Sequence, residues 1–301
     1  MWQSLLKQWV MGAARDRLQQ AASAAAKAAA GPAASRGQEP NQAGLDNSST
    51  PIAVSEPSVC HVGLVFALSM EAGSLVDRLS GVLRTQGAGF VVREGGLAGR
   101  RLVIVESGVG MQAAARGVKA LLAGHKPRWV ISAGFAGGLD DKVRKGDIVM
   151  ANEVIDPGGP RLAIDFKIDP QVLAQTPRLH VGGLLTTDRV ITRAAEKRKL
   201  GVTHRALAVD METLAVARAC QAEKVRFLAI RAISDSVDQE LPRDVDRLVK
   251  KKSMAGRLGA AAGAIVNRPS SIKDMWQLKE DALVASNRLA AFLAGIVPQL
   301  D

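Results

Sequence analysis

The fold is decided by residues 209–236, which read VDMETLAVARACQAEKVRFLAIRAISDS. Within them, a segment with helical spacing is followed by an apolar, strand-like run that carries Arg231 and leads into Ser234 and Asp235. In an open α/β sheet, ligands bind beyond the carboxyl ends of the strands, so Asp235 is predicted to lie at a binding site. A carboxyl group that is desolvated there can keep a proton near neutral pH and donate it to a leaving group.

A second carboxylate, Glu212, precedes Asp235 by 23 positions and lies near the start of the predicted helix. The two carboxylates therefore bracket a helix and a strand. This arrangement suits cleavage of a bond between a sugar and a base, which needs an acid for the base and an anion for the sugar hydroxyls.

The rest of the chain from residue 62 alternates short apolar runs with segments of helical spacing. Strands are predicted at 62–68, 102–107, 129–133, 147–151 and 227–232, and helices at 70–79, 111–123 and 210–221. The alternation predicts an α/β sheet with helices on its faces. Residues 155–180 are irregular and are predicted to form a loop over the site.

Four blocks resemble, in the same order, the nucleoside phosphorylase and nucleosidase superfamily. They are residues 62–79 (VGLVFALSMEAGSLVDRL), 105–115 (VESGVGMQAAA), 129–149 (WVISAGFAGGLDDKVRKGDIV) and the 209–236 stretch. Within the superfamily, the sequence is most similar to the methylthioadenosine/S-adenosylhomocysteine nucleosidases. The resemblance covers roughly residues 60–245. It implies a single α/β domain with a mixed central sheet flanked by helices, a homodimer, a small nucleoside substrate and no cofactor.

The resemblance also implies roles for the two carboxylates. In the family, the aspartate of the Ser-Asp motif faces adenine and is the acid, which assigns that role to Asp235; a helix N-cap is the alternative. The Met-Glu pair of the family binds the ribose. Glu212 would then hold the 2′ and 3′ hydroxyls while Met211 packs against the sugar. The alternative is an acid that stabilises a helix start and a methionine in the core.

Glu71 lies at the position of the family's glutamate that holds the nucleophilic water. That glutamate usually belongs to an acidic run, whereas Glu71 follows Ser69 and Met70. An acid at a helix N-terminus is the alternative. Arg231 would help to bind water in a nucleosidase or phosphate in a phosphorylase, and a salt bridge to Glu71 is an equally physical account.

A glycine-rich segment, SAGFAGG at residues 132–138, follows an apolar strand. As a loop it could present the backbone amides of Ser132, Ala133 and Gly134 to the ribose or to the nucleophile, with a generic tight turn as the alternative. Phe135 stands where the family often has a small residue, so the local shape of the site is expected to differ.

Val190 and Ile191 align with a family segment in which an aromatic residue stacks on adenine and the next backbone unit contacts the base. Val190 replaces that aromatic residue. The replacement implies weaker stacking and leaves a purine other than adenine open. Asp188 would support Asp235 from behind it, or is an ordinary turn acid.

Composition excludes several other classes of protein. The two cysteines, Cys60 and Cys220, are far apart and lack CxxC spacing, so a reduced compartment is predicted rather than a disulfide scaffold. The four histidines form no pair with metal-ligand spacing, and no metal is expected. Aromatic residues make up only 3% of the chain, so the core must be aliphatic.

The net charge of +11 is concentrated in residues 247–279, where eight basic residues face one acid. Nucleic-acid binding is not expected, because only Trp276 in that stretch could stack on a base. An anionic membrane surface suits the stretch better. A solvated cationic face is the alternative.

Three regions are predicted along the chain. Residues 1–58 form a flexible tail with a short amphipathic helix, 59–250 form the nucleosidase or phosphorylase domain, and 251–301 form a helical, basic C-terminal extension. The amphipathic start could lie on a membrane. No uninterrupted apolar run reaches the ~18 residues of a span, so a cytoplasmic location is expected, with peripheral membrane contact as an option.

Three functions follow as hypotheses. The first is hydrolysis of methylthioadenosine or S-adenosylhomocysteine to adenine and a thioribose. The second is phosphorolysis, including cleavage of a lipid-linked adenosyl substrate such as adenosylhopane presented at a membrane. The third is a nucleoside-binding module with a decayed site.

Overall fold

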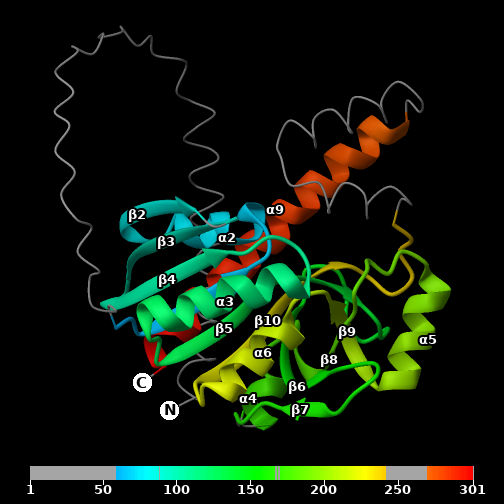
Figure 1. Cartoon of the computed structure of the whole chain (residues 1–301). Coiled ribbons are helices and arrows are strands. Elements are labelled where there is room, and N and C mark those ends of the chain that lie inside the picture. The colour runs from blue at the N-terminus through cyan, green and yellow to red at the C-terminus, as the bar shows by residue number, and fades with distance from the viewer. Residues whose placement is uncertain (1–58, 88, 167, 169, 242–269, 301) are drawn as a thin grey trace, which may run out of the picture.

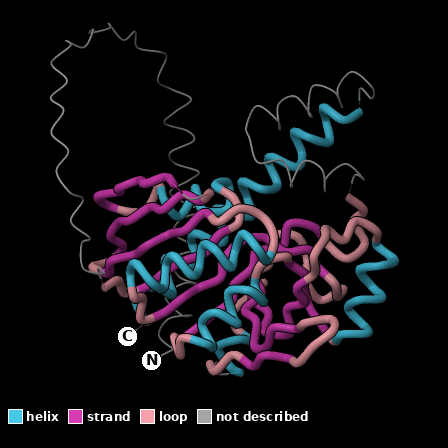
Figure 2. Tube along the Cα trace, in the orientation of Figure 1, coloured by secondary structure: helices cyan, strands magenta, loops and turns pink. Residues whose placement is uncertain are grey.

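The computed structural model describes residues 59–87, 89–166, 168, 170–241 and 270–300. They form one mixed sheet with helices on both faces (Figures 1 and 2), which confirms the predicted fold class. The predicted tail at 1–58 and the basic residues 247–269 lie outside the described part of the chain.

Ten strands belong to the sheet in the described residues: β1 (Val62–Phe66), β2 (Ser80–Gly87), β3 (Phe90–Leu97), β4 (Arg100–Glu106), β5 (Trp129–Gly138), β6 (Ile148–Ile155), β7 (Arg161–Ala163), β8 (Leu179–Thr186), β9 (Ala206–Asp210) and β10 (Arg226–Asp235). The helices are α2 (Ser69–Val76), α3 (Met111–His125), α4 (Pro170–Ala174), α5 (Ala194–His204), α6 (Thr213–Ala222) and α9 (Ser270–Ile296), which is followed by a 3₁₀ turn, η1 (Val297–Gln299).

The centre of the sheet is built from strands that are buried on both faces. All five residues of β1 are buried, and β1 lies parallel to β4 on one side and to β5 on the other. Continuous apolar runs are typical of parallel strands covered by helices. Helices α3 and α6 pack together on one face, and α2 and α9 pack together on the other (Figure 1).

Strand β5 changes partner along one of its edges, and this change creates the site. On that edge its residues 129–132 run parallel to β1, whereas Gly137 and Gly138 pair antiparallel with β9. Its other edge stays parallel to β10 as far as Gly137. With β6 and β8, these strands close a ring in the order β5–β10–β6–β8–β9. Gly137 is the register partner of both Asp235 and Val209. The ring therefore brings the two ends of the 209–236 stretch together.

The C-terminal part of α9 shares the core of the sheet. Its Leu289, Phe292 and Leu293 are buried in the same apolar cluster as β1 and β10. The window Ala282–Gln299 is long and apolar enough to span a membrane by length and composition, although it includes Arg288. Of that window, 44% is buried against the rest of the protein.

Several elements were not predicted from the sequence. Strands β2, β3, β8 and β9 and helix α5 lie in segments without a clear apolar period. The predicted loop at 155–180 contains β7, α4 and the start of β8. The predicted helix at 210–221 begins only at Thr213, because Asp210 still belongs to β9.

Candidate active site

A cavity of about 190 Å³ lies where β1, β5, β9 and β10 end. Six of the ten residues predicted for the site line it. They are Glu71, Val190, Ile191, Met211, Glu212 and Asp235. Phe135, Ala136 and Gly137 form another part of the wall.

Glu71 is buried at the start of α2 and is held by backbone amides. Its Oε2 accepts hydrogen bonds from the amides of Ala67 and Leu68, at 3.0 and 2.9 Å, and its Oε1 accepts one from Phe135 at 2.9 Å. Burial raises the pKa of Glu71 above its usual 4.5, although the three amides and the charge of Arg231 act in the opposite direction. Glu71 is thus both a helix N-terminal acid and a group that faces the cavity, as both sequence interpretations required.

Glu212 is the residue immediately before α6. Its Oε1 accepts a hydrogen bond of 2.6 Å from the amide of Gly110, and its Oε2 accepts one of 3.2 Å from Met211. Burial, and next the neighbouring Asp210 carboxylate, raise the pKa of Glu212. The charged form of Glu212 therefore costs free energy, and a cationic ligand would offset that cost.

Asp235 is held quite differently at the last residue of β10. Its Oδ2 lies 2.5 Å from the Lys197 ammonium nitrogen, and its Oδ1 accepts a 2.6 Å hydrogen bond from the Ser234 hydroxyl. Asp235 is only 5% exposed and lines the cavity. Both oxygens of the Asp235 carboxyl group are therefore held by other side chains, and the group still faces the cavity.

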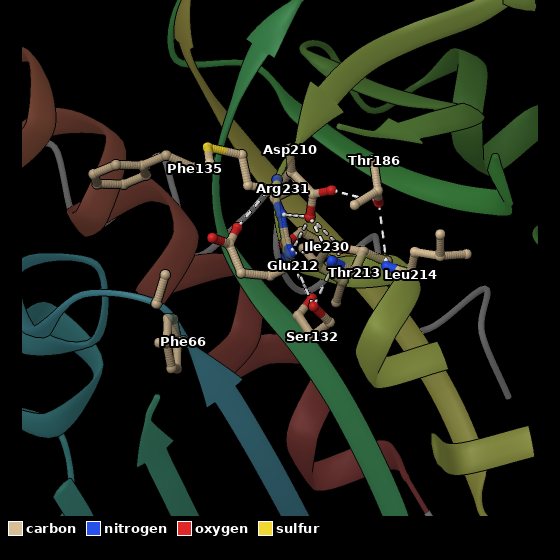
Figure 3. A network of polar contacts seen from close by, with 12 residues as sticks. Phe66, Ser132, Phe135, Thr186, Asp210, Glu212, Thr213, Leu214, Ile230 and Arg231 are labelled. Carbon is tan, nitrogen blue, oxygen red and sulfur yellow. Dashed lines mark hydrogen bonds and ion pairs between the residues drawn. The ribbon is translucent and has the colours of Figure 1, made fainter. Parts of the chain in front are cut away.

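Arg231 lies behind the cavity wall, 2% exposed, and its salt-bridge partner is Asp210, with 2.7 Å between Nη2 and Oδ2 (Figure 3). The predicted alternative of a salt bridge to Glu71 is therefore wrong. Asp210 also accepts from the Thr213 amide and hydroxyl and from the Thr186 hydroxyl. The remaining contacts of the guanidinium group are the Ser132 carbonyl and hydroxyl, the Thr213 hydroxyl and the Ile230 carbonyl.

Ser132, Ala133 and Gly134 are not on the cavity wall. Ser132 and Ala133 are buried within β5, where the Ser132 hydroxyl contacts Arg231 and Thr213. Gly134 lies against Glu71, and a Cβ added there would be 2.9 Å from Oε1. These residues shape the site from behind because β5 continues to Gly138, and Phe135 to Gly137 line the cavity instead.

Two residues that contact the candidate site residues were missed by the sequence analysis. Asp210 was visible next to Met211 and Glu212, but its pairing with Arg231 depends on the closed ring of strands. Lys197 comes from α5, a helix whose neighbouring Arg198 and Lys199 are exposed, so nothing in the local sequence distinguishes it. The part of the chain that the structure describes contains no group of three or more His, Cys, Asp or Glu side chains that could hold a metal ion.

The amino-acid sequence is similar to known proteins. The sequence profile of the phosphorylase superfamily matches residues 61–267. A curated 5′-methylthioadenosine/S-adenosylhomocysteine nucleosidase from Colwellia psychrerythraea is 30% identical over an alignment of 215 residues, and the match covers 62% of this chain and 88% of the relative.

Solved structures of nucleosidases with the same name have the same fold. The enzyme from Neisseria meningitidis, in complex with methylthio-immucillin-A, has a TM-score of 0.60 and 23% identity, and the match covers 80% of this chain and 100% of that one. The Colwellia enzyme in complex with adenine has a TM-score of 0.59 and 24% identity, with 81% and 96% covered.

The superfamily match takes in 207 of the 301 residues and includes every residue that lines the cavity. It agrees with the resemblance that the four sequence blocks indicated. This chain is a member of the phosphorylase superfamily.

Proposed function

We propose that the protein hydrolyses the N-glycosidic bond of a 5′-substituted adenosine, either methylthioadenosine or S-adenosylhomocysteine, to adenine and a thioribose. The observation that carries the proposal is the convergence of Glu71, Glu212 and Asp235 from three elements on one cavity. The names of the relatives supply the substrate class. Cleavage of such a bond leaves positive charge on the ribose and negative charge on the departing base, so carboxyl groups suit both ends.

Asp235 is the general acid in this proposal. It donates its proton to the purine as the bond between the base and C1′ breaks, so the base leaves as a neutral molecule. Ser234 and Lys197 hold the two oxygens of Asp235, which keeps the carboxyl group aimed at the base.

Glu212 binds the ribose hydroxyls, and Met211 packs against the sugar. Both side chains line the cavity. The charge of Glu212 and that of Asp210 behind it favour the cation that develops on the ribose. Because burial makes the charged form of Glu212 costly, a cation that forms in the reaction is stabilised more than a neutral ground state.

Glu71 is the base that accepts a proton from the attacking water while the water oxygen bonds to C1′. A carboxylate with a raised pKa is a better base than an ordinary one, and burial gives Glu71 that property. Arg231 acts from behind the wall, where its charge lowers the pKa of both Glu71 and Glu212.

Water is favoured over phosphate as the nucleophile by the surroundings of Glu71. The Arg231 guanidinium group is bonded to Asp210, Ser132, Thr213 and Ile230 and does not line the cavity. A phosphate dianion would approach a carboxylate with no compensating contact from Arg231, which is costly. Phosphorolysis of a lipid-linked adenosyl substrate is the alternative. It was motivated by the N-terminal segment and by the basic stretch 247–279, of which residues 1–58 and 247–269 lie outside the described chain.

The test is adenine release from both thioether nucleosides by the purified full chain, with and without added phosphate. The proposal expects equal rates in the two buffers and a free thioribose product. Release that requires phosphate and yields a sugar 1-phosphate would move the protein to the phosphorylases.

A homodimer and peripheral membrane contact are also proposed, as the resemblance and the charge distribution suggested. Met70, adjacent to Glu71, is 48% exposed, and its apolar side chain supports a contact between the two subunits beside the cavity. Light scattering on the wild type and on Met70→Asp would detect the dimer and its loss. Flotation with anionic vesicles would test the membrane contact.

A further inference from the structure

Helix α5 places one lysine, Lys197, entirely inside the protein. Its exposure is 0%, whereas Arg198 and Lys199 beside it are exposed. Burying a lysine is costly unless its charge is paired and its three donors are bonded. Such a lysine needs an explanation in terms of its partners.

The Lys197 ammonium group is fully bonded. It lies 2.5 Å from Asp235 Oδ2, and it donates to the backbone carbonyls of Ser236, at 3.0 Å, and Gln239, at 2.7 Å. One side chain therefore holds both the carboxyl group that faces the cavity and the chain segment that follows it. Leu241, at the end of that segment, lines the same cavity.

The depth of the lysine is set by Gly201, one helical turn further along α5. A Cβ at Gly201 would be only 2.2 Å from the backbone oxygen of Leu139 and 3.2 Å from its Cβ. Since residues four apart share a helix face, this close approach at Gly201 presses the Lys197 face of α5 onto the end of β5. The position of Lys197 is thus built into the packing of α5.

We propose that Lys197 is a positioning residue for the leaving-group acid: it fixes the Asp235 carboxyl group at the cavity wall, aimed at the base. The inference rests on the proposed function. A carboxyl group whose orientation is fixed before the substrate binds loses less freedom when it transfers its proton, and this lowers the barrier. The proton itself comes from Asp235, and Lys197 keeps its own.

Other charged groups lie near Asp235. Lys145, in the turn between β5 and β6, interacts electrostatically with Asp235 and is partly exposed. Arg189, Glu71, Asp210 and Glu212 line the same cavity, and the exposed Asp238 and Glu240 follow Asp235 along the chain. Lys197 is the residue that forms a salt bridge with the Asp235 carboxyl group.

The experiment compares kcat and KM of the wild type, Lys197→Met and Lys197→Arg on methylthioadenosine and on a p-nitrophenyl methylthioriboside, whose leaving group needs no proton. For Lys197→Met we expect kcat for adenine release to fall about tenfold or more with KM little changed, because the acid is no longer held in line with the base. The nitrophenyl substrate should be cleaved at nearly the wild-type rate. Lys197→Arg keeps a charged donor beside Asp235 and should recover part of the loss.

Lys199→Met, on the exposed face of the same helix, is the matched control and should leave both rates unchanged. Gly201→Ala should lower the rate on the adenine substrate by forcing α5 outward. Thermal melts of every variant measure folding, and Lys197→Arg carries the test if Lys197→Met melts early. Equal losses on the two substrates in a folded Lys197 variant would overturn the inference and leave the proposed function intact. A wild type that releases no adenine would overturn both.

Discussion

At one end of the cavity, Glu71 and Glu212 accept hydrogen bonds from backbone amides, those of Leu68 and Gly110 at the starts of α2 and α3 and that of Phe135 in β5. At the other end, Asp235 lies between the Lys197 ammonium group and the Ser234 hydroxyl. Amide donors carry no net charge, so burial still raises the pKa of Glu71 and Glu212. Asp235 instead is in contact with the full positive charge of the Lys197 ammonium group.

The difference teaches how one functional group can serve two tasks. A carboxylate whose charge is incompletely compensated attracts protons and cations, which suits the water and ribose end. A carboxyl group that is held by an ammonium group at one oxygen and by a hydroxyl group at the other keeps a fixed orientation, which suits transfer of a proton at the base end.

The largest effect is expected at Asp235. Asp235→Asn removes the proton that the base receives but keeps the size of the side chain, so kcat for adenine release should fall about 10²- to 10⁴-fold. Thermal melts should show a folded protein. Asp238→Asn, an exposed acid on the following segment, is the control and should retain full activity. Full activity in Asp235→Asn would remove the acid role.

The support of the ribose end is tested at Arg231. Arg231→Met leaves the buried Asp210 charge unpaired, which should reduce the free energy of unfolding by about 3–5 kcal/mol. Arg198→Met breaks the exposed pair with Asp141, and a loss of about 0–1 kcal/mol is expected there. Urea unfolding measures both variants. Equal losses would mean that the Arg231 network does not hold the site.

Sequence reasoning located both ends of the cavity but not what holds them. Asp235 and Glu212 were predictable because each follows a strand and belongs to a local pattern. The pairs Lys197–Asp235 and Arg231–Asp210 join segments 38 and 21 positions apart, and they exist only once β5, β10 and β9 are in register. Local periodicity does not encode such contacts.

Two misplaced elements have simpler physical causes. The glycine-rich residues 134–138 read as a loop, but they continue β5 because β10 and β9 supply partners for their backbone groups. Strand β2 reads SGVLRTQG and is exposed at every residue, so it lacks the apolar alternation by which a half-buried strand is recognised. Its pairing with β3 alone defines it.

At the end of the cavity where backbone amides hold the carboxyl groups, Glu212 should make the stability of the folded protein depend on pH. Since the pKa of Glu212 is raised in the folded protein, its contribution to stability is full below about pH 4.5, its usual value, and is lost as the pH rises through the folded-state pKa. Melting temperatures from pH 5 to 9 should therefore fall by a few degrees more in the wild type than in Glu212→Gln. Parallel curves would show that Glu212 titrates normally.

The smallest effect is expected at Phe135, which lines the cavity and donates its amide to Glu71. Phe135→Leu keeps the backbone donor but removes apolar contact, so KM should rise by about three- to tenfold, equivalent to ~1 kcal/mol, with kcat little changed. Steady-state kinetics with two different 5′ substituents would measure it. A large fall in kcat instead would mean that the ring orders Glu71.

The contrast between the two ends is tested most directly by changing the leaving group. Rates are compared for methylthioadenosine and for a p-nitrophenyl methylthioriboside, whose p-nitrophenolate leaves without a proton, using the wild type, Asp235→Asn and Glu71→Gln. The account predicts that Asp235→Asn loses about 10²-fold or more on the adenine substrate and little on the nitrophenyl one, while Glu71→Gln loses activity on both. Equal losses of Asp235→Asn on the two substrates would contradict it.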